Sequence, residues 1–292
     1  QQADTIPLWR KTQRPCPTAN RLMPANRFLC YNPATFHPPD RSPETMTADF
    51  RLRFSIQSWH AASTRLHTGE DWAAWASGRL NATDLPDTPP KVDFLPAMQR
   101  RRLGLSARLL FAAAHPLLAE GEPCPLVLAS HDGEINRSFG LWVTLLRDNE
   151  VSPTSFGLSV HNALAGQWSM LRGDMSEYTA LSVRQDGLET AVLEAAGLLA
   201  DGAERVLAVV VDEPLQAQYP AAPAERAPFA HALALLLTAG EEWELSPAAP
   251  DGGTANCGYW GAIEWLRQQH SGSRRWINRY ADKAWQWQRL TP

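Results

Sequence analysis

The sequence predicts an α/β protein in which short apolar strands alternate with amphipathic helices. The clearest example is the apolar run Tyr178–Val183, which is followed by helical periodicity over Asp186–Ala200 and by a second apolar run, Arg205–Val211. Strands separated by helices in this way are parallel, and the helices cover both faces of the sheet. With 44% hydrophobic and 20% charged residues, the chain has the composition of a folded globular protein.

The first part of the chain divides into an extension and the start of the domain. Residues 1–45 contain eight prolines and little apolar periodicity, which predicts a disordered, proline-rich extension. The domain itself is expected to begin at Met46 and to run to residue 250. Polar and apolar residues alternate from Arg51 to Trp59, which is the period of a half-buried strand. A short helix is expected over Asp71–Leu80.

The middle of the chain supplies the remaining elements of a five-stranded, mixed but mostly parallel sheet. Apolar residues near helical spacing predict one long amphipathic helix over Met98–Glu120. Pro125–Ala129 reads as a short buried strand, and the segment after it reads as a helix that ends near Leu146. The apolar run Ala230–Leu237 is expected to be the fifth strand.

The helix over Asp186–Ala200 also has a local signal for its start. Asp186 is followed three residues later by Glu189, and this spacing is typical of a capping box, in which two side chains satisfy free backbone amides. Leu188, Val192 and Leu199 contribute to an apolar stripe on one face. The turn at residues 184 and 185 is therefore predicted to join a buried strand directly to a helix.

Three segments of the chain carry a resemblance to a known family. They are Met98–Arg108 with its three consecutive arginines, Val151–Gly166 with its Ser-Pro start and its Asn-x-x-x-Gly end, and the strand, turn and helix around Gly187. Together they resemble the N-terminal half of β-ketoacyl synthases, in particular the short chain-length-factor-like proteins of aryl polyene and type II polyketide systems. The resemblance covers roughly Phe50 to Glu244 and implies a thiolase-like half.

One position of the turn departs from the family. In β-ketoacyl synthases the turn carries a nucleophilic Cys three residues before a Gly, whereas here Gly187 follows Arg184 and Gln185. No acyl thioester can form on a guanidinium. A helix N-terminus stabilises a thiolate but not a cation, so Arg184 is expected to reach Asp186, Glu189 or a carboxylate of another chain.

The second half of a complete synthase is also missing from the resemblance. In that family the second half brings two histidines, one in a His-Gly-Thr loop and one near a Gly-rich Phe-Gly turn. After Glu244 this sequence has His270 alone, in a polar helix. The resemblance therefore implies a non-catalytic, ketosynthase-like subunit without catalytic residues, of the kind found in fatty acid, polyketide or aryl polyene biosynthesis.

The resemblance also implies partners and the residues that meet them. A full-length β-ketoacyl synthase subunit is the expected partner, and an acyl carrier protein is expected to be involved indirectly. In the family the strand before the turn lies across the dimer axis, so the interface residues would be Tyr178, Thr179, Ala180, Leu181, Ser182 and Val183. Four further residues would line the acyl tunnel: Ser159, His161, Asn162 and Gly166.

An enzyme remains the alternative interpretation. A divergent acyltransferase or hydrolase could use Ser182, Ser159 or Ser130 as its nucleophile, with His161 or His131 as the base. The consecutive residues Ser130, His131 and Asp132 do not make a triad by themselves, because neighbouring side chains diverge and cannot form the relay of hydrogen bonds. Helix capping after a strand is the simpler role for them.

The charge distribution bears on nucleic acid as a partner. Residues 1–45 and 271–292 are net basic, and the segment between them is net acidic, which suits nucleic acid poorly. Residues 251–292 form a basic, aromatic tail. Its segment 274–289 interleaves cations with aromatic residues, which is typical of a helix that docks on a partner or on its own domain. The same pattern is found where a segment stacks on single-stranded nucleic acid or sits at a membrane surface.

Other motifs are missing from the sequence. The four cysteines are scattered and have no C-x-x-C pair, so neither a zinc site nor a disulfide framework is expected, and a cytoplasmic location is predicted. No G-x-G-x-x-G or Walker motif is found, so no cofactor is expected. No signal peptide or apolar run of membrane-spanning length is seen, and stable membrane insertion is not expected.

Overall fold

The computed structural model describes residues 50–219, 226–249, 255–258 and 260–291, and the predicted extension at residues 1–45 lies outside them. The helices are α1 (Gly69–Ala76), α2 (Ala97–Arg100), α3 (Leu105–Ala114), α4 (Ile135–Asp148), α5 (Pro153–Gly157), α6 (Ala163–Arg172), α7 (Gly187–Ala200) and α8 (Gly261–His270), with 3-10 turns at Ala82–Asp84 and His115–Leu117. The strands are β1 (Leu52–Ser63), β2 (Leu126–Ser130), β3 (Tyr178–Ser182), β4 (Arg205–Asp212), β5 (His231–Pro247), β6 (Arg275–Arg279) and β7 (Ala284–Arg289).

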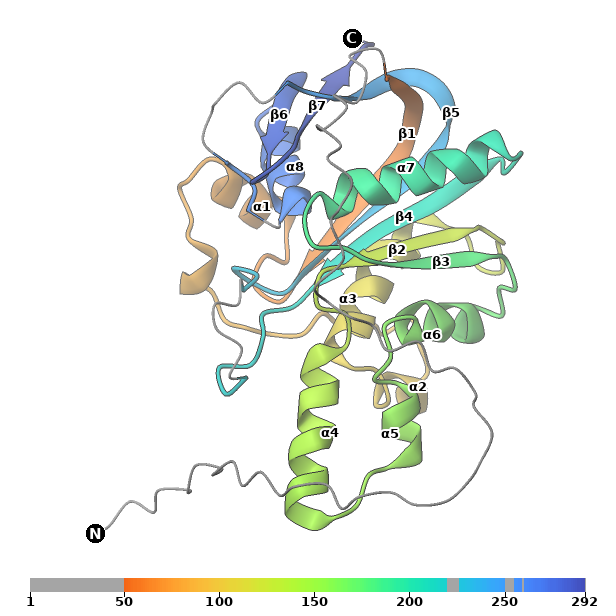
Figure 1. Cartoon of the computed structure of the whole chain (residues 1–292), viewed down its shortest axis with the longest axis vertical. Helices are drawn as coiled ribbons and strands as arrows, with labels where there is room; N and C mark the ends of the chain where they lie inside the picture. The colour runs from red at the N-terminus through yellow and green to blue at the C-terminus, as the bar shows by residue number, and fades with distance from the viewer. Residues whose placement is uncertain (1–49, 220–225, 250–254, 259, 292) are drawn as a thin grey trace, which may run out of the picture. The chain divides into compact units, whose positions relative to one another are not determined.

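All seven strands belong to one mixed sheet (Figure 1). Their order is β3-β2-β4-β5-β7-β6, and β1 pairs with β5 outside this path. β3, β2 and β4 are parallel to one another, whereas β5 pairs antiparallel with β4, β1 and β7. The predicted α/β class is confirmed, with seven strands in the mixed sheet in place of the expected five.

β5 is much longer than the predicted strand, which ended at Leu237. Its first residues are buried between β4 and β1, and its last residues pair with β7. Between them, Thr238 to Glu242 is polar and mostly outside the core. This polar interruption hides the continuation of the strand in the sequence, although Trp243 and Leu245 are buried again beyond it.

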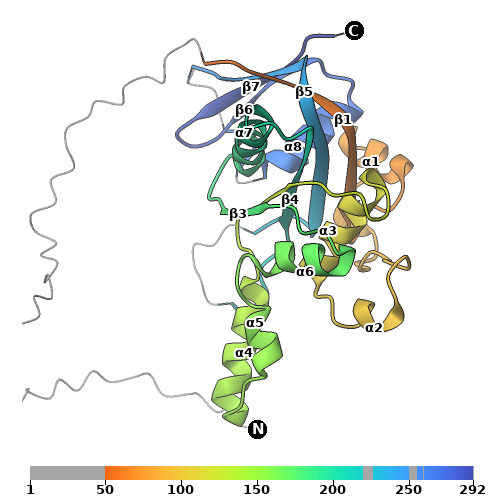
Figure 2. The ribbon, with the colours of Figure 1, turned by 90° about the vertical axis from the view of Figure 1, so that its right-hand side faces the viewer.

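Alternate residues along the strands pack into two separate hydrophobic layers, one on each face of the sheet. On β2, Val127 and Ala129 face the layer that contains α7, α8 and the C-terminal strands, whereas Leu126 and Leu128 face the layer that contains α3 and α6. Figure 2 shows α7 on one side of β4 and β5 and α3 on the other. Helices therefore cover both faces of the sheet, as predicted from the alternation of strands and helices.

The long helix predicted over Met98–Glu120 is wrong, because the segment divides into α2, α3 and a 3-10 turn. Gly104 stands at the N-cap of α3 with an extended backbone. It packs so closely against α4 that a Cβ there would overlap the Arg137 guanidinium. At the other end, Pro116 lies in the 3-10 turn that terminates α3.

The helix predicted over residues 274–289 is also wrong, because these residues form the antiparallel hairpin β6–β7. Trp285 and Trp287 are buried and alternate with the more exposed Gln286 and Gln288, which is the period of a strand. β7 then pairs with β5 and joins the hairpin to the sheet. Trp276, Tyr280, Trp285 and Trp287 are thus part of the core, where they cannot stack on nucleic acid bases.

Candidate functional site at the turn between β3 and α7

The turn at Arg184 joins β3 to α7 at the end of the parallel strands. Gly187 begins α7, and a Cβ at this position would lie 2.7 Å from the Cγ2 atom of Val183. Asp186 occupies the left-handed region, with φ 46° and ψ 36°, which few residues other than Gly, Asn and Asp adopt. The turn is therefore as tight as the sequence predicted, and it depends on Gly187 for close packing.

Arg184 is exposed, and it lines a shallow cavity of about 260 Å³ with Gln185, Asp186 and Lys283. The sequence predicted that its guanidinium would reach Asp186, Glu189 or a carboxylate of another chain. The first two are wrong, because both carboxylates are bound by other side chains, and the third stays a prediction. Within the described part of the chain, Arg184 makes no hydrogen bond or ion pair, so its charge faces solvent.

Asp186 binds the C-terminal hairpin instead of capping α7. One carboxylate oxygen accepts from Lys283 Nζ at 3.1 Å, and the other accepts from Trp285 Nε1 at 3.0 Å. The adjacent Gln185 side chain accepts from the backbone N–H of Ala281 at 3.2 Å. The predicted capping box is therefore wrong, since no side chain caps the first turn of α7. Hydrogen bonds from residues 281–285 hold the turn between β3 and α7 instead.

Glu189 completes this attachment inside the core. Its side chain is fully buried, and it accepts hydrogen bonds from Asn278 Nδ2 at 2.7 Å, Tyr280 Oη at 2.8 Å and Trp287 Nε1 at 2.9 Å. Burial raises the pKa of Glu189, and the three hydrogen bonds oppose that effect. None of the three donors carries a charge, so the site holds a carboxyl group without an ion pair.

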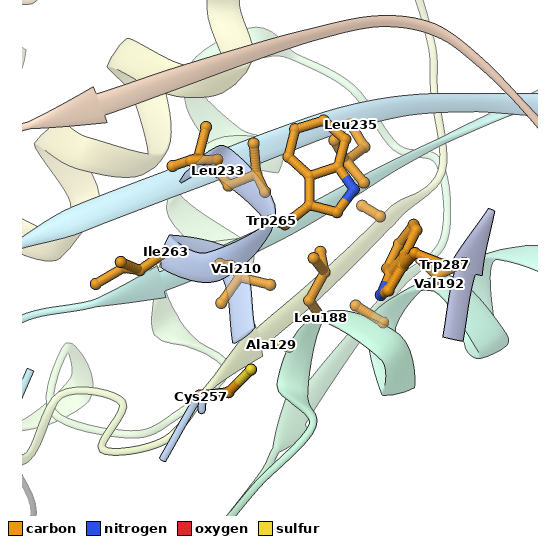
Figure 3. Close-up of a cluster of buried hydrophobic side chains, with 14 of the residues drawn as sticks. Ala129, Leu188, Val192, Val210, Leu233, Leu235, Cys257, Ile263, Trp265 and Trp287 are labelled. Atoms are coloured by element: carbon orange, nitrogen blue, oxygen red, sulfur yellow. The ribbon is translucent and has the colours of Figure 1, made fainter. Parts of the chain in front are cut away.

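The described cysteines do not replace the missing nucleophile. Cys257 lies near Leu188 in the core beneath the start of α7 (Figure 3). Burial, aided by Glu189, raises the pKa of its thiol well above the usual range. Burial also raises the pKa of Cys124 to about 11. Both thiols are therefore protonated and unreactive at neutral pH.

The end of β2 beside the turn carries the serine and histidine of the alternative interpretation. Ser130 is buried and donates to Asp212 Oδ1 at 3.1 Å, while its oxygen accepts from the Gly133 N–H at 2.8 Å. His131 Nδ1 lies 3.0 Å from the Val183 carbonyl. Burial raises the pKa of Asp212 to about 7. Ser130 thus bonds to a buried carboxyl and a backbone amide, which is a structural arrangement and not a nucleophile with its base.

The predicted interface strand, β3, is an edge strand, and in the described chain it pairs with β2 alone. The Glu177 carbonyl and the Val183 N–H both bond to β2. Because the direction of hydrogen bonding alternates along a strand, the intervening N–H groups of Tyr178, Ala180 and Ser182 point away from β2. They form an unpaired edge of the sheet.

The four residues predicted to line a tunnel lie along the segment from α5 to α6, between α4 and β3. Ser159 follows α5, and its carbonyl accepts from Ser138 Oγ of α4. The His161 ring packs on Gly133, where a Cβ would overlap it. Asn162 precedes α6 as its N-cap residue, and Gly166 lies inside α6 near the Tyr178 hydroxyl.

Sequence reasoning missed the exposed apolar surface of α4 and α5. No residue of α4 is buried, and Figures 1 and 2 show the two helices extending together away from the sheet. Trp142 is 59% exposed, Leu146 73% and Phe156 62%. The amphipathic pattern of α4 was visible in the sequence, but such a pattern equally predicts a helix that packs on its own core.

No group of three or more His, Cys, Asp or Glu residues able to hold a metal ion is found in the described part of the chain. Of the described helices, none combines the length and the apolar character that crossing a bilayer requires. The arrangement at the turn therefore offers a shaped backbone, an exposed cation and a free strand edge.

Comparison with known families and structures gives a consistent result. Residues 72–288 match the family described as "Beta-ketoacyl synthase, N-terminal domain". This match includes β6 and most of β7, which the sequence analysis had assigned to a separate tail. A comparison with curated protein sequences gave no match.

Three solved structures show the same fold. A chain from the complex of a ketosynthase (ApeO) with its chain length factor (ApeC) from Xenorhabdus doucetiae is 24% identical, with a TM-score of 0.70, and the alignment covers 82% of this chain and 100% of that one. The ishigamide ketosynthase/chain length factor gives 15% identity, a TM-score of 0.53 and coverages of 76% and 74%. A β-ketoacyl synthase from Burkholderia phymatum STM815 gives 14%, 0.51, 76% and 71%.

Proposed function

The chain belongs to the β-ketoacyl synthase N-terminal domain family, and we propose that it is a non-catalytic subunit that pairs with a complete, Cys-bearing β-ketoacyl synthase. The observation that carries this proposal is the turn between β3 and α7. It keeps the backbone of a nucleophile turn, with Gly187 packed on Val183, but it presents Arg184 to solvent. A guanidinium can neither accept nor transfer an acyl group.

The free edge of β3 supports pairing with a second subunit. Unpaired N–H and C=O groups along an edge strand are a template for another strand, and the edge groups of Tyr178, Ala180 and Ser182 are available. Apolar side chains that a partner would cover lie on α6 and just before β3, where Met170 is 72% and Met175 91% exposed. The exposed face of α4 and α5 adds to the area that such a partner could bury.

The proposed role of the subunit is to shape or limit the acyl tunnel of its partner. The position of Ser159, His161, Asn162 and Gly166 along the segment between α4 and β3 supports this role, because β3 is the proposed interface. An acyl carrier protein would then meet the complex through the catalytic partner. In this proposal the chain works in the cytoplasm and contributes to fatty acid, polyketide or aryl polyene synthesis.

Co-expression with the ketosynthase encoded nearest to this chain tests the proposal. A tag on one subunit should capture the other, and size-exclusion chromatography should show a heterodimer. Ala180→Pro removes an edge N–H without touching the ladder to β2, so it should abolish capture while the chain itself stays folded. Ala180→Thr keeps the N–H and is the matched control. A chain that stays monomeric beside every co-expressed ketosynthase contradicts the proposal.

A second experiment tests the non-catalytic character. Arg184→Cys restores a thiol at the turn, but no histidine base accompanies it, so incubation with an acyl-carrier substrate should leave the purified variant unacylated by intact mass spectrometry. Arg184→Ser is the matched control for any change in the turn. Time-dependent acylation of the Cys variant alone would show that this chain carries its own catalytic apparatus.

A further inference from the structure

A cavity of about 660 Å³ lies apart from the turn, and none of its lining residues belongs to β3 or α7. Its lining comes from the C-terminal part of β1, the loop that leads to α1, and residues 85–94. The end of α3 and the 3-10 turn at His115–Leu117 also line it. Its volume is within the range of small-molecule sites, about 300 to 1,000 Å³.

The walls of this cavity are mostly apolar and well ordered by packing. Leu66 is 1% exposed, and Ala62 beside it on β1 is also buried. Phe94 stacks on His115 with ring centroids 3.6 Å apart and ring planes 18° apart. Ala112 of α3 also lines the cavity. Such a surface can hold a hydrocarbon body without rearranging, since the stacked pair and the buried side chains are already in place.

Two cationic side chains, Arg65 and Lys91, and one carboxylate, Asp71, line the cavity. Arg65 is held in place by the Leu85 carbonyl at 2.6 Å and by Asp87 at 3.3 Å. Lys91 is exposed at the rim. The Asp71 carboxylate is the acid of the lining, and one of its oxygens is already taken by the backbone N–H groups of residues 67 and 68.

Two histidines of the lining, His60 and His115, have a lowered pKa, which favours their neutral form. Burial lowers the pKa of His60, which donates a hydrogen bond to the Ala112 carbonyl. Burial and the nearby Arg172 guanidinium lower the pKa of His115. The permanent positive charge at the cavity therefore comes from Arg65 and Lys91, and Lys91 has no carboxylate partner among the described residues.

We propose that this cavity binds a monoanionic ligand with an apolar body, of the class of medium-chain carboxylic acids. The hydrocarbon chain lies against Leu66, Ala112 and Phe94, and the carboxylate lies at the rim, where Lys91 and Arg65 attract it. This site is independent of the subunit pairing proposed above, because the edge of β3 takes no part in it. The ligand would bind the chain whether or not a ketosynthase partner is present.

Isothermal titration calorimetry of the full chain with sodium decanoate tests the site. We expect saturable binding with a Kd at or below about 1 mM and no binding of decyltrimethylammonium, which has the same alkyl chain and the opposite charge. Lys91→Glu should weaken decanoate binding by about tenfold or more, which corresponds to about 1.4 kcal/mol. Arg274→Glu makes the same change of charge at an exposed position outside the cavity and should leave the Kd unchanged.

A second pair of variants tests the volume of the cavity. Ala112→Trp places a large side chain in the lining and should abolish decanoate binding. Ala196→Trp places the same side chain at a half-buried position of α7 and should not. Thermal melts show whether each variant is folded, and the exposed Lys91 variant keeps the test decisive if Ala112→Trp does not fold. The proposal is overturned if wild type binds no decanoate, if both amphiphiles bind equally, or if a folded Ala112→Trp variant binds as wild type does.

Discussion

α4 and α7 are helices of 14 residues that follow the neighbouring parallel strands β2 and β3, yet they differ in how many of their residues are buried. α7 buries six of its residues, including the carboxyl group of Glu189. α4 buries none, and it leaves Trp142 and Leu146 in solvent. Other parts of the described chain therefore cover one face of α7, whereas the apolar side chains of α4 stay exposed.

The two helices contribute differently to the stability of the described domain. On α7, the buried carboxyl group of Glu189 accepts hydrogen bonds from residues of the C-terminal hairpin. These bonds remove the free-energy penalty of burying the group unpaired. On α4, the exposed leucines and tryptophan contribute little to folding, since burial in the chain itself is what stabilises an apolar side chain. Three variants can break or sharpen this contrast.

Glu189→Ala should have the largest effect. It leaves Asn278 Nδ2, Tyr280 Oη and Trp287 Nε1 buried without an acceptor, and each unsatisfied donor costs about 1 to 3 kcal/mol. The free energy of unfolding should therefore fall by at least about 3 kcal/mol in urea titrations. Glu194→Ala, on the same helix, removes a single hydrogen bond to Thr179 and should cost about 1 kcal/mol. Equal losses for the two variants would contradict the network described for Glu189.

Glu189→Gln should have a smaller effect that depends on pH. Because burial raises the pKa of Glu189 in the folded protein, the wild-type carboxyl contributes most stability when protonated, at pH values below its ordinary pKa of about 4.5. That contribution is lost as the pH rises through the folded pKa. Urea titrations from pH 5 to 9 should thus show the wild type losing stability relative to the Gln variant. A constant difference over this range would mean that the pKa is not raised.

Leu146→Ala should have the smallest effect on the isolated chain. The side chain is 73% exposed, so its truncation should change the free energy of unfolding by less than about 0.5 kcal/mol. Leu188→Ala is the matched change on α7, where the side chain is 1% exposed, and it should cost about 2 to 5 kcal/mol. If α4 belongs to the proposed interface, Leu146→Ala should instead weaken capture of the co-expressed ketosynthase. If the free energy of unfolding fell by similar amounts in Leu146→Ala and Leu188→Ala, the proposed difference between α4 and α7 would be contradicted.

Much of the fold could be predicted because its signals are local. The apolar runs and helical periodicity placed β2, β3, α7 and β4 within a residue or two, since strand and helix periods differ clearly in this part of the chain. The break at Gly104 was missed because it depends on the approach of Arg137, which lies on another helix. The hairpin β6–β7 was missed because its interleaved cations and tryptophans were interpreted as a helix face, although they alternate with period two.

The candidate site was predictable in place but not in its contacts. Arg184 lies where a strand is followed directly by a helix. Its position was predictable because the signals for both elements come from residues close to it in the sequence. The spacing of Asp186 and Glu189 matched a capping box, but tertiary partners overrode the local motif, because Trp285 and Trp287 lie almost a hundred residues later. Exposure of α4 could not be predicted either, since an amphipathic pattern does not say what covers its apolar face.

The fastening of the turn by residues 278–287 has a consequence for how the protein is made. While the ribosome is still adding those residues, the carboxylates of Asp186 and Glu189 lack the side chains that later donate hydrogen bonds to them. The face of α7 that packs on the hairpin stays exposed during this time. Contacts that span so much of the chain form late. The nascent polypeptide should therefore gain resistance to proteolysis around α7 only after Trp287 has left the exit tunnel.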